Sequence, residues 1–185
     1  MRSVLAGAAI AMVAALMCGP VSAAISPADV ADPPPAGQFV WDPDGAPSGP
    51  IRIVVSLPTQ TAYVLQGGAL IGVSSVSSGR PGHDTPTGVF NVLEKDPDHH
   101  SSLYDDAPMP FMQRLTWDGV ALHAGKVPNH PASHGCIRLP LEFARALYGV
   151  TRVGARVEVT DEYVEPDQLV STAESSGYTS VAASR

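Results

Sequence analysis

Short runs of β-branched and aromatic residues, separated by glycine and proline, recur through the middle of this chain. Residues 51–56 and 61–66 are two such runs, and residues 69–74 are a third. Gly67 and Gly68 separate the last two runs, and glycine tolerates the positive φ angles that a two-residue hairpin turn requires. The pattern predicts three strands, of which the last two form a tight hairpin.

Further runs of the same kind lie at residues 88–93, 111–116, 119–123 and 155–160. Only residues 140–149 have a helical pattern, because proline begins the segment, glycine ends it and apolar residues recur three and four positions apart. Short strands with turn residues between them favour a mainly β fold of sandwich or barrel-like form, with one short helix.

The two ends of the chain differ from this region. Residues 1–23 combine an early arginine, a short apolar stretch and small residues before Ala24, which is the pattern of a secretory signal peptide. Residues 24–50 are rich in proline, alanine and glycine and predict an extended linker, and residues 161–185 predict a flexible tail. We therefore expect an exported protein of the periplasm or cell envelope, with a folded domain at 51–160 and no membrane span after cleavage.

Charge and cysteine content narrow the function further. The chain holds 18 acidic residues against 11 lysines and arginines, a balance that argues against a nucleic-acid partner. Removal of the leader takes Cys18 with it and leaves Cys136 as the single thiol, so no internal disulfide can form. A lone thiol in an oxidising compartment is either buried and inert or chemically active, and composition alone does not choose between the two.

The polar residues that can act on this thiol precede it closely in the sequence. His123 ends a predicted strand, and Ser133, His134 and Gly135 directly precede Cys136. A thiol attacks a carbonyl as its thiolate, which needs a nearby base or positive charge. A glycine at this point lets a backbone amide approach a substrate oxygen, as an oxyanion hole requires. If the intervening loop folds back, the local sequence contains every component of a cysteine acyl-transfer site.

This arrangement resembles the L,D-transpeptidase catalytic domain, also called the YkuD family. Its signature is an upstream histidine followed, after a loop, by Ser/Thr-His-Gly-Cys and an apolar residue, which His123 and residues 133–137 match. Residues 85–90 are similar to the turn-and-strand element that precedes the active site in these domains. The resemblance covers residues 51–160 and implies the family's fold, with no cofactor and no metal.

The resemblance also implies a role for individual residues. Cys136 is the expected nucleophile, and His123 is the expected base that takes its proton and later gives it to the leaving amine. The backbone amides of Gly135 and Cys136 are expected to hold the oxyanion together with His134. The backbone carbonyl of Ala124 is expected to orient the imidazole.

The remaining site residues have less specific roles. Ser133 and His134 are expected to shape the loop, and for His134 a structural hydrogen bond is favoured over proton transfer. Arg138 stands where some family members have asparagine, and it either binds a substrate carboxylate through a two-pronged contact or braces the loop through backbone carbonyls. Phe111 is a candidate lining residue of the donor pocket, although Phe111 and Trp117 are more typical of a core.

Other histidines raise a different chemistry, because imidazole is a common metal ligand. They are His83, His99, His100 and His130. Residues 96–102 contain the adjacent pair, but they lack the ligand spacing of zinc motifs and predict a solvated loop. Because several histidines are present, a metal-dependent wall hydrolase is the alternative class of enzyme. A non-catalytic wall-binding module is a third hypothesis.

The partner that the resemblance implies is a tetrapeptide stem of peptidoglycan. Cys136 would attack its amide carbonyl, release D-alanine and pass the acyl group to an amine of a neighbouring stem. Water in place of the amine would give a carboxypeptidase or endopeptidase, and a wall-attached lipoprotein is a third candidate acceptor. The sequence does not rank these acceptors.

Overall fold

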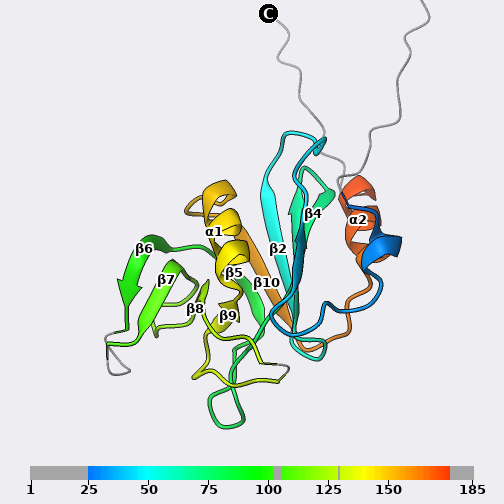
Figure 1. The fold of residues 1–185 in the computed structure, drawn as a ribbon. Helices are drawn as coiled ribbons and strands as arrows, with labels where there is room; N and C mark the ends of the chain where they lie inside the picture. Colours follow the sequence, from blue (N-terminus) through cyan, green and yellow to red (C-terminus); the bar gives the residue numbers. More distant parts are fainter. Residues whose placement is uncertain (1–24, 102–105, 129, 176–185) are drawn as a thin grey trace, which may run out of the picture.

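A computed structural model of the chain describes residues 25–101, 106–128 and 130–175. Within these residues, two β-sheets pack on either side of helix α1 (Figure 1). The expected signal peptide at 1–23 and the last ten residues of the expected tail lie outside the described residues. Among the described residues, no helix combines the length and the apolar character that a membrane crossing requires.

The larger sheet has the strand order β1-β4-β3-β2-β10-β5, and the smaller has the order β6-β7-β8-β9. This architecture confirms the prediction of a mainly β fold. The strands are β1 (Phe39–Trp41), β2 (Ile51–Ser56), β3 (Thr61–Gln66), β4 (Ala69–Ser75), β5 (Gly88–Asn91), β6 (Glu94–His100), β7 (Pro108–Arg114), β8 (Ala121–Ala124), β9 (Ile137–Leu139) and β10 (Arg156–Thr160). The helices are the 3₁₀ turn η1 (Pro27–Val30), α1 (Leu141–Val150) and α2 (Pro166–Ser175).

Strands β2, β3 and β4 form the antiparallel centre of the larger sheet, as their sequence pattern predicts. Gly67 and Gly68 make the turn between β3 and β4 with φ angles of +56° and +91°. These are the left-handed angles of a two-residue hairpin, which glycine adopts without steric cost. Strand β10 then pairs with β2 in parallel and with β5 antiparallel, so the end of the domain returns to the middle of its first sheet.

The main core lies between the two sheets and one face of α1. The larger sheet contributes aliphatic side chains such as Ile53 and Val64, and the smaller sheet contributes Leu122 and Ile137. Phe143 of α1 is fully buried among them. This packing fixes the smaller sheet in place, with one face toward the core and the other available for a site.

The expectation of an extended linker at residues 24–50 is contradicted at residues 27–30 and 39–41, which form η1 and β1. Strand β1 pairs with β4, and the rings of Phe39 and Trp41 lie 5.6 Å and 5.4 Å from that of Phe143. The linker prediction followed the proline content and gave no weight to these two aromatic residues. Their packing on Phe143 stabilises the segment against α1. The backbone N–H of Ile25 also donates to Leu70 O, which ties the start of the described chain to β4.

The expected tail likewise departs from the prediction in its first part. Helix α2 lies beside η1 and covers the outer face of the larger sheet (Figure 1). Leu169 is buried there with Ile25 and Val30 in a second apolar cluster, against β-strand residues such as Tyr63. The described residues therefore contain the predicted helix after Cys136, which is α1, and a further α-helix, α2, that the sequence pattern did not predict.

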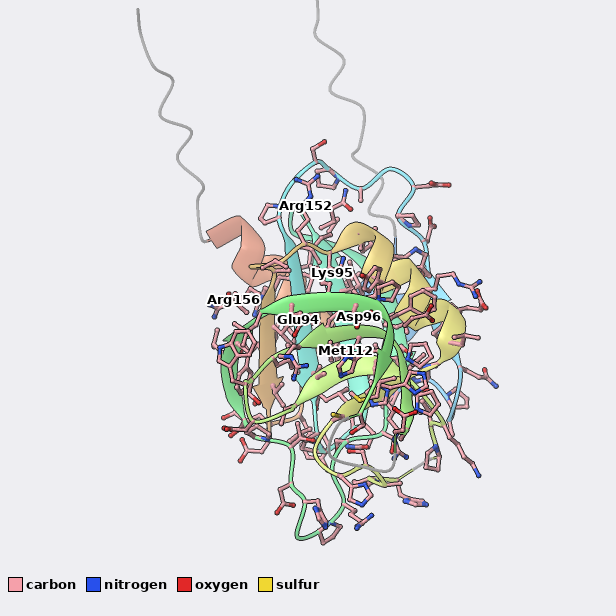
Figure 2. All side chains as sticks on the ribbon, turned by 90° about the vertical axis from the view of Figure 1, so that its left-hand side faces the viewer. Glu94, Lys95, Asp96, Met112, Arg152 and Arg156 are labelled. Atoms are coloured by element: carbon pink, nitrogen blue, oxygen red, sulfur yellow. The ribbon has the colours of Figure 1, made fainter. Side chains whose placement is uncertain are left out.

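Strand β6 occupies residues for which the sequence predicted a solvated loop. It is an edge strand, where Pro97 is tolerated because a missing N–H costs little on the unpaired side. Figure 2 looks onto this side of the molecule and labels Lys95 on β6 and Met112 on β7. The Nζ of Lys95 donates to the carbonyls of Tyr148 and Thr151, at 2.6 Å and 2.7 Å. This contact holds the edge of the smaller sheet to the C-terminal end of α1.

Candidate active site

The parallel pairing of β8 and β9 brings the predicted histidine and cysteine onto one face of the smaller sheet. His123 pairs with Arg138, and Leu122 pairs with Ile137. Leu122 and Ile137 point into the core, so the alternation of a strand directs His123 and Arg138 to the opposite face. Cys136, one residue before Ile137, lies on that opposite face beside Ala121 and the methionines of β7.

A cavity of about 330 Å³ opens over this face. His123 and Cys136 both line it, so the fold brings together two groups that lie thirteen positions apart in the sequence. None of the described lining residues is acidic, although the whole chain has a net charge of −7. The lining residues are Ser101, Ala107, Pro108, Met109, His123, Ala124, Gly125, Lys126, Ser133, His134, Cys136 and Arg138.

The surroundings of His123 fix its protonation state. Its Nδ1 lies 2.8 Å from the backbone oxygen of Ala124. A carbonyl oxygen only accepts, so Nδ1 carries the proton and donates it. Burial lowers the pKa of His123 to about 4. The positive charge of Arg138 also lowers this pKa, whereas the hydrogen bond to Ala124 raises it. The imidazole is therefore neutral near pH 7, with the lone pair on Nε2, as a general base requires.

The thiol of Cys136 is also neutral in this state. It donates to the backbone oxygen of Gly119 at 3.3 Å. Burial raises the pKa of the Cys136 thiol. A backbone hydrogen bond from Ala121 and the positive charges of Arg138 and Arg114 each lower this pKa, but they offset the effect of burial only in part. In the described site the thiol proton thus points to Gly119 rather than to His123. No pattern in the sequence indicated this contact, because Gly119 lies in the turn between β7 and β8.

Ser133 organises the backbone around the cysteine. Its hydroxyl donates to the backbone oxygen of Cys136 and accepts from the N–H of Gly135 at 3.1 Å. This second bond uses the Gly135 N–H, which was one of the two amides expected to hold the oxyanion. The Cys136 N–H takes no part in these bonds and is the amide left for that role. Gly135 has a φ of +113°, so the turn at this position requires glycine.

The loop from Ser78 to Thr85 packs along the motif. The backbone N–H of Arg80 donates to Ser133 O, and the N–H of Ser133 donates to Ser78 O. The Thr85 hydroxyl accepts from the Gly79 N–H at 2.8 Å and donates to Gly135 O at 2.9 Å. Residues 85–90 resemble an element of the family, but no local pattern in the sequence indicated that Thr85 contacts the catalytic motif.

Arg138 is one of the residues that line the cavity. Its aliphatic part packs on Gly125, where an added Cβ would lie 3.2 Å from the Cγ and Cδ of the arginine. In the described part of the chain, its guanidinium has no hydrogen bond to a backbone carbonyl. Of the two roles that the sequence left open, this placement favours contact with a ligand over bracing of the loop.

The structure places Phe111 away from the cavity. Its ring lies 5.8 Å from that of Tyr148 on α1, and the guanidinium of Arg145 lies 5.5 Å above it. The expectation that Phe111 lines the donor pocket is therefore wrong, because a φ of +58° turns this residue toward the helix. Trp117 is 74% exposed, so the core interpretation fails for it.

The other histidines are dispersed around the smaller sheet and its loops. His99 lies 3.3 Å from Asp96 on its own strand, and the ring of His83 packs edge-on against that of His134 at 4.9 Å. Among the described residues, no group of three or more histidine, cysteine, aspartate or glutamate side chains is placed to hold a metal ion. The rival reading as a metal-dependent hydrolase thus gains no support from the arrangement of these side chains.

Comparison with known proteins bears directly on the site. The model of one protein family, the L,D-transpeptidase catalytic domain or YkuD, matches residues 50–159, which is more than half of the chain. The chain belongs to the L,D-transpeptidase family. This finding confirms the resemblance that His123 and the motif at 133–137 indicated. The matched region runs from the start of β2 into β10, so it contains every residue of the cavity in this L,D-transpeptidase domain.

Solved structures similar to this domain are L,D-transpeptidases. One from Mycobacterium tuberculosis H37Rv has 27% sequence identity and a TM-score of 0.57, covering 60% of this chain and 57% of that one. One from Mycobacterium smegmatis has 26% identity and a TM-score of 0.56, covering 60% and 58%. L,D-transpeptidase 3 from M. tuberculosis, in complex with a faropenem-derived adduct, has 26% identity and a TM-score of 0.56, covering 60% of each chain.

The match to these neighbours is partial in length. This L,D-transpeptidase chain spans less than two thirds of each of the three solved chains. A search of curated protein sequences found no match.

Proposed function

We propose that this chain is an exported peptidoglycan L,D-transpeptidase that works through a thioester on Cys136. The observation that carries the proposal is the shared cavity of Cys136 and His123, in which the imidazole is held neutral and no described residue makes a hydrogen bond to its Nε2. A thiol and a base on one face of a sheet, beside an amide for the oxyanion, suit acyl transfer from an amide donor. Family membership supports the same chemistry.

The first half of the reaction forms the thioester. Sγ of Cys136 bonds to the carbonyl carbon of the donor amide as Nε2 of His123 takes the thiol proton, and the carbonyl oxygen becomes an oxyanion facing the Cys136 N–H. The carbon–nitrogen bond then breaks, and D-alanine leaves with the proton that the imidazolium returns. The thiol must first turn from Gly119 O to His123 before this proton transfer.

The second half transfers the acyl group. An acceptor amine attacks the thioester carbon, gives its proton to Nε2 of His123, and the thiol of Cys136 leaves with that proton restored. The proposed acceptor is an amine of a neighbouring stem peptide. Water in its place would make the same site a carboxypeptidase or endopeptidase, and a lysine of a wall-attached lipoprotein would make it a protein-anchoring enzyme.

The charge of the cavity supports an anionic donor. Arg138 and Lys126 line it together with His123 and His134, without an acidic neighbour among the described lining residues. The guanidinium of an arginine can bind a carboxylate through two parallel hydrogen bonds. We propose that Arg138 binds a free carboxylate of the stem peptide. The enzyme would then recognise its donor through the peptide rather than through the glycan.

Substitution of Arg138 tests this assignment. Arg138→Gln is expected to raise KM for the donor about 10- to 100-fold, because a charged hydrogen bond contributes about 1.5–3 kcal/mol. The value of kcat should change far less. Steady-state kinetics with free and amidated donors would show the wild type discriminating between them and the variant failing to do so. Arg145→Gln, on the exposed surface of α1, is the matched control. Equal discrimination by Arg138→Gln and wild type would contradict the assignment.

The proposed activity is tested by product analysis. The mature protein is incubated with a purified disaccharide-tetrapeptide, and the products are separated by liquid chromatography and identified by mass spectrometry. Release of D-alanine with a cross-linked dimer supports the transpeptidase. Release of D-alanine with tripeptide alone would assign water as the acceptor. No release of D-alanine by folded protein would refute thioester chemistry on this donor.

A further inference from the structure

The hydroxyl of Thr85 occupies a defined place beside the catalytic motif. It lies between the N–H of Gly79 and the backbone oxygen of Gly135, at 2.8 Å and 2.9 Å. Thr85 is 6% exposed, so water cannot readily replace either bond. The two partners come from separate segments, and the hydroxyl connects the loop after β4 with the residue that precedes Cys136.

The direction of these two bonds follows from the chemistry of the partners. An amide N–H only donates, so the oxygen of Thr85 accepts from Gly79. A carbonyl oxygen only accepts, so the hydroxyl proton of Thr85 goes to Gly135 O. The Gly79 bond thereby leaves the hydroxyl proton free to point at Gly135.

The peptide between Gly135 and Cys136 carries this orientation to the nucleophile. It is trans, since the described residues contain no cis peptide bond. In a trans peptide the C=O and the next N–H point in opposite directions. Thr85 holds the oxygen on one side, so the N–H of Cys136 is directed to the other.

No other described contact fixes this peptide unit in the same way. The two bonds of Ser133 hold the units on either side, because they use the N–H of Gly135 and the oxygen of Cys136. Gly135 has no Cβ to restrict rotation, so its own backbone offers little resistance to a flip. The orientation of the Cys136 N–H therefore depends on Thr85.

The loop that carries Thr85 is closed too tightly for the residue to drift. A Cβ at Gly79 would lie 1.9 Å from the backbone oxygen of His83 and 2.8 Å from the N of Thr85. Only glycine fits this place, and the backbone bonds of Arg80 and Ser133 fasten the same loop to the motif. The hydroxyl is thus held in advance of any substrate.

We infer that Thr85 is a positioning residue, which directs the Cys136 N–H at the oxyanion that forms during acylation. This inference rests on the proposed function, because it needs an acyl donor. It assigns a catalytic consequence to a side chain that does not line the cavity.

Two reactions of the Cys136 thiol distinguish this positioning role from a purely structural role of Thr85. Acylation by a tetrapeptide donor develops an oxyanion, whereas alkylation by iodoacetamide displaces iodide at a saturated carbon and develops none. Thr85→Val keeps the shape and removes the hydroxyl, Thr85→Ala removes it without added bulk, and Thr85→Ser retains it. Thr87→Val is the matched control, since Thr87 is exposed in the same segment.

We expect kcat for D-alanine release to fall about 10- to 100-fold in Thr85→Val and Thr85→Ala, somewhat less than the loss of an oxyanion donor itself. KM should change little, Thr85→Ser should stay near wild type, and all variants should be alkylated at the wild-type rate. Equal loss of acylation and alkylation, or normal acylation in both hydroxyl-free variants, would overturn the inference alone. A wild type that is alkylated but releases no D-alanine would overturn the proposed function and the inference with it.

Discussion

Cys136→Ala is expected to eliminate D-alanine release from a tetrapeptide donor, with a loss of at least about 10³-fold. The reason is that no other thiol follows residue 23, and the hydroxyl of Ser133 is committed to the backbone of the motif. The remaining amide and the base can orient water only weakly. Rapid-quench sampling of donor turnover by mass spectrometry gives the measurement.

The fold of this variant must be shown to be intact. Cys136 is partly buried beside Ala121, so alanine removes one sulfur without introducing a polar group, and circular dichroism should match that of the wild type. Residual release of D-alanine within tenfold of wild type, by a folded Cys136→Ala protein, would show that the nucleophile lies elsewhere.

His123→Gln has the second largest expected effect. It removes the Nε2 lone pair, and general base catalysis contributes about 10²–10⁴-fold to the rate. The acylation rate should fall by that factor, while binding of the donor changes little. His130→Gln, which alters an exposed histidine outside the cavity, is the control and should leave the rate unchanged.

The wild type should also show an unusual pH profile. Since the pKa of His123 is about 4, the base form persists as pH falls through 6.5 and is lost only near pH 4. Values of kcat/KM should therefore hold constant from about pH 8 down to about pH 5 and decline below that. An acid limb centred near the ordinary histidine value of about 6.5 would mean that His123 is less buried than described, or is not the base.

The sequence predicted those elements whose residues carry their own local signal. Gly67 and Gly68 specify a hairpin through backbone freedom alone, and the strands at 51–56 and 61–66 agree with the structure to the residue. Residues 39–41 do not carry such a signal. Their strand forms because Phe39 and Trp41 find the ring of Phe143, about a hundred positions away.

The candidate site likewise contains residues that the sequence indicated and contacts that only the fold creates. The motif and its upstream histidine indicated Cys136 and His123, since the chemistry needs a thiol and a base whatever the fold. The contact of the thiol with Gly119 and the hydroxyl of Thr85 depend on how separate loops meet, and no spacing in the sequence encodes them. Phe111 was misplaced because its direction depends on a left-handed backbone angle that few residues adopt.

Acylation by a carbapenem tests the central claim most directly. A solved relative holds a faropenem-derived adduct, and a strained β-lactam carbonyl needs only a nucleophile, a base and an oxyanion site to open. Imipenem should add the mass of one drug molecule to the wild-type chain, and peptide mapping should locate it on Cys136. The Cys136→Ala protein should gain no mass. A folded wild type that remains unmodified, or an adduct on any other residue, would contradict the account.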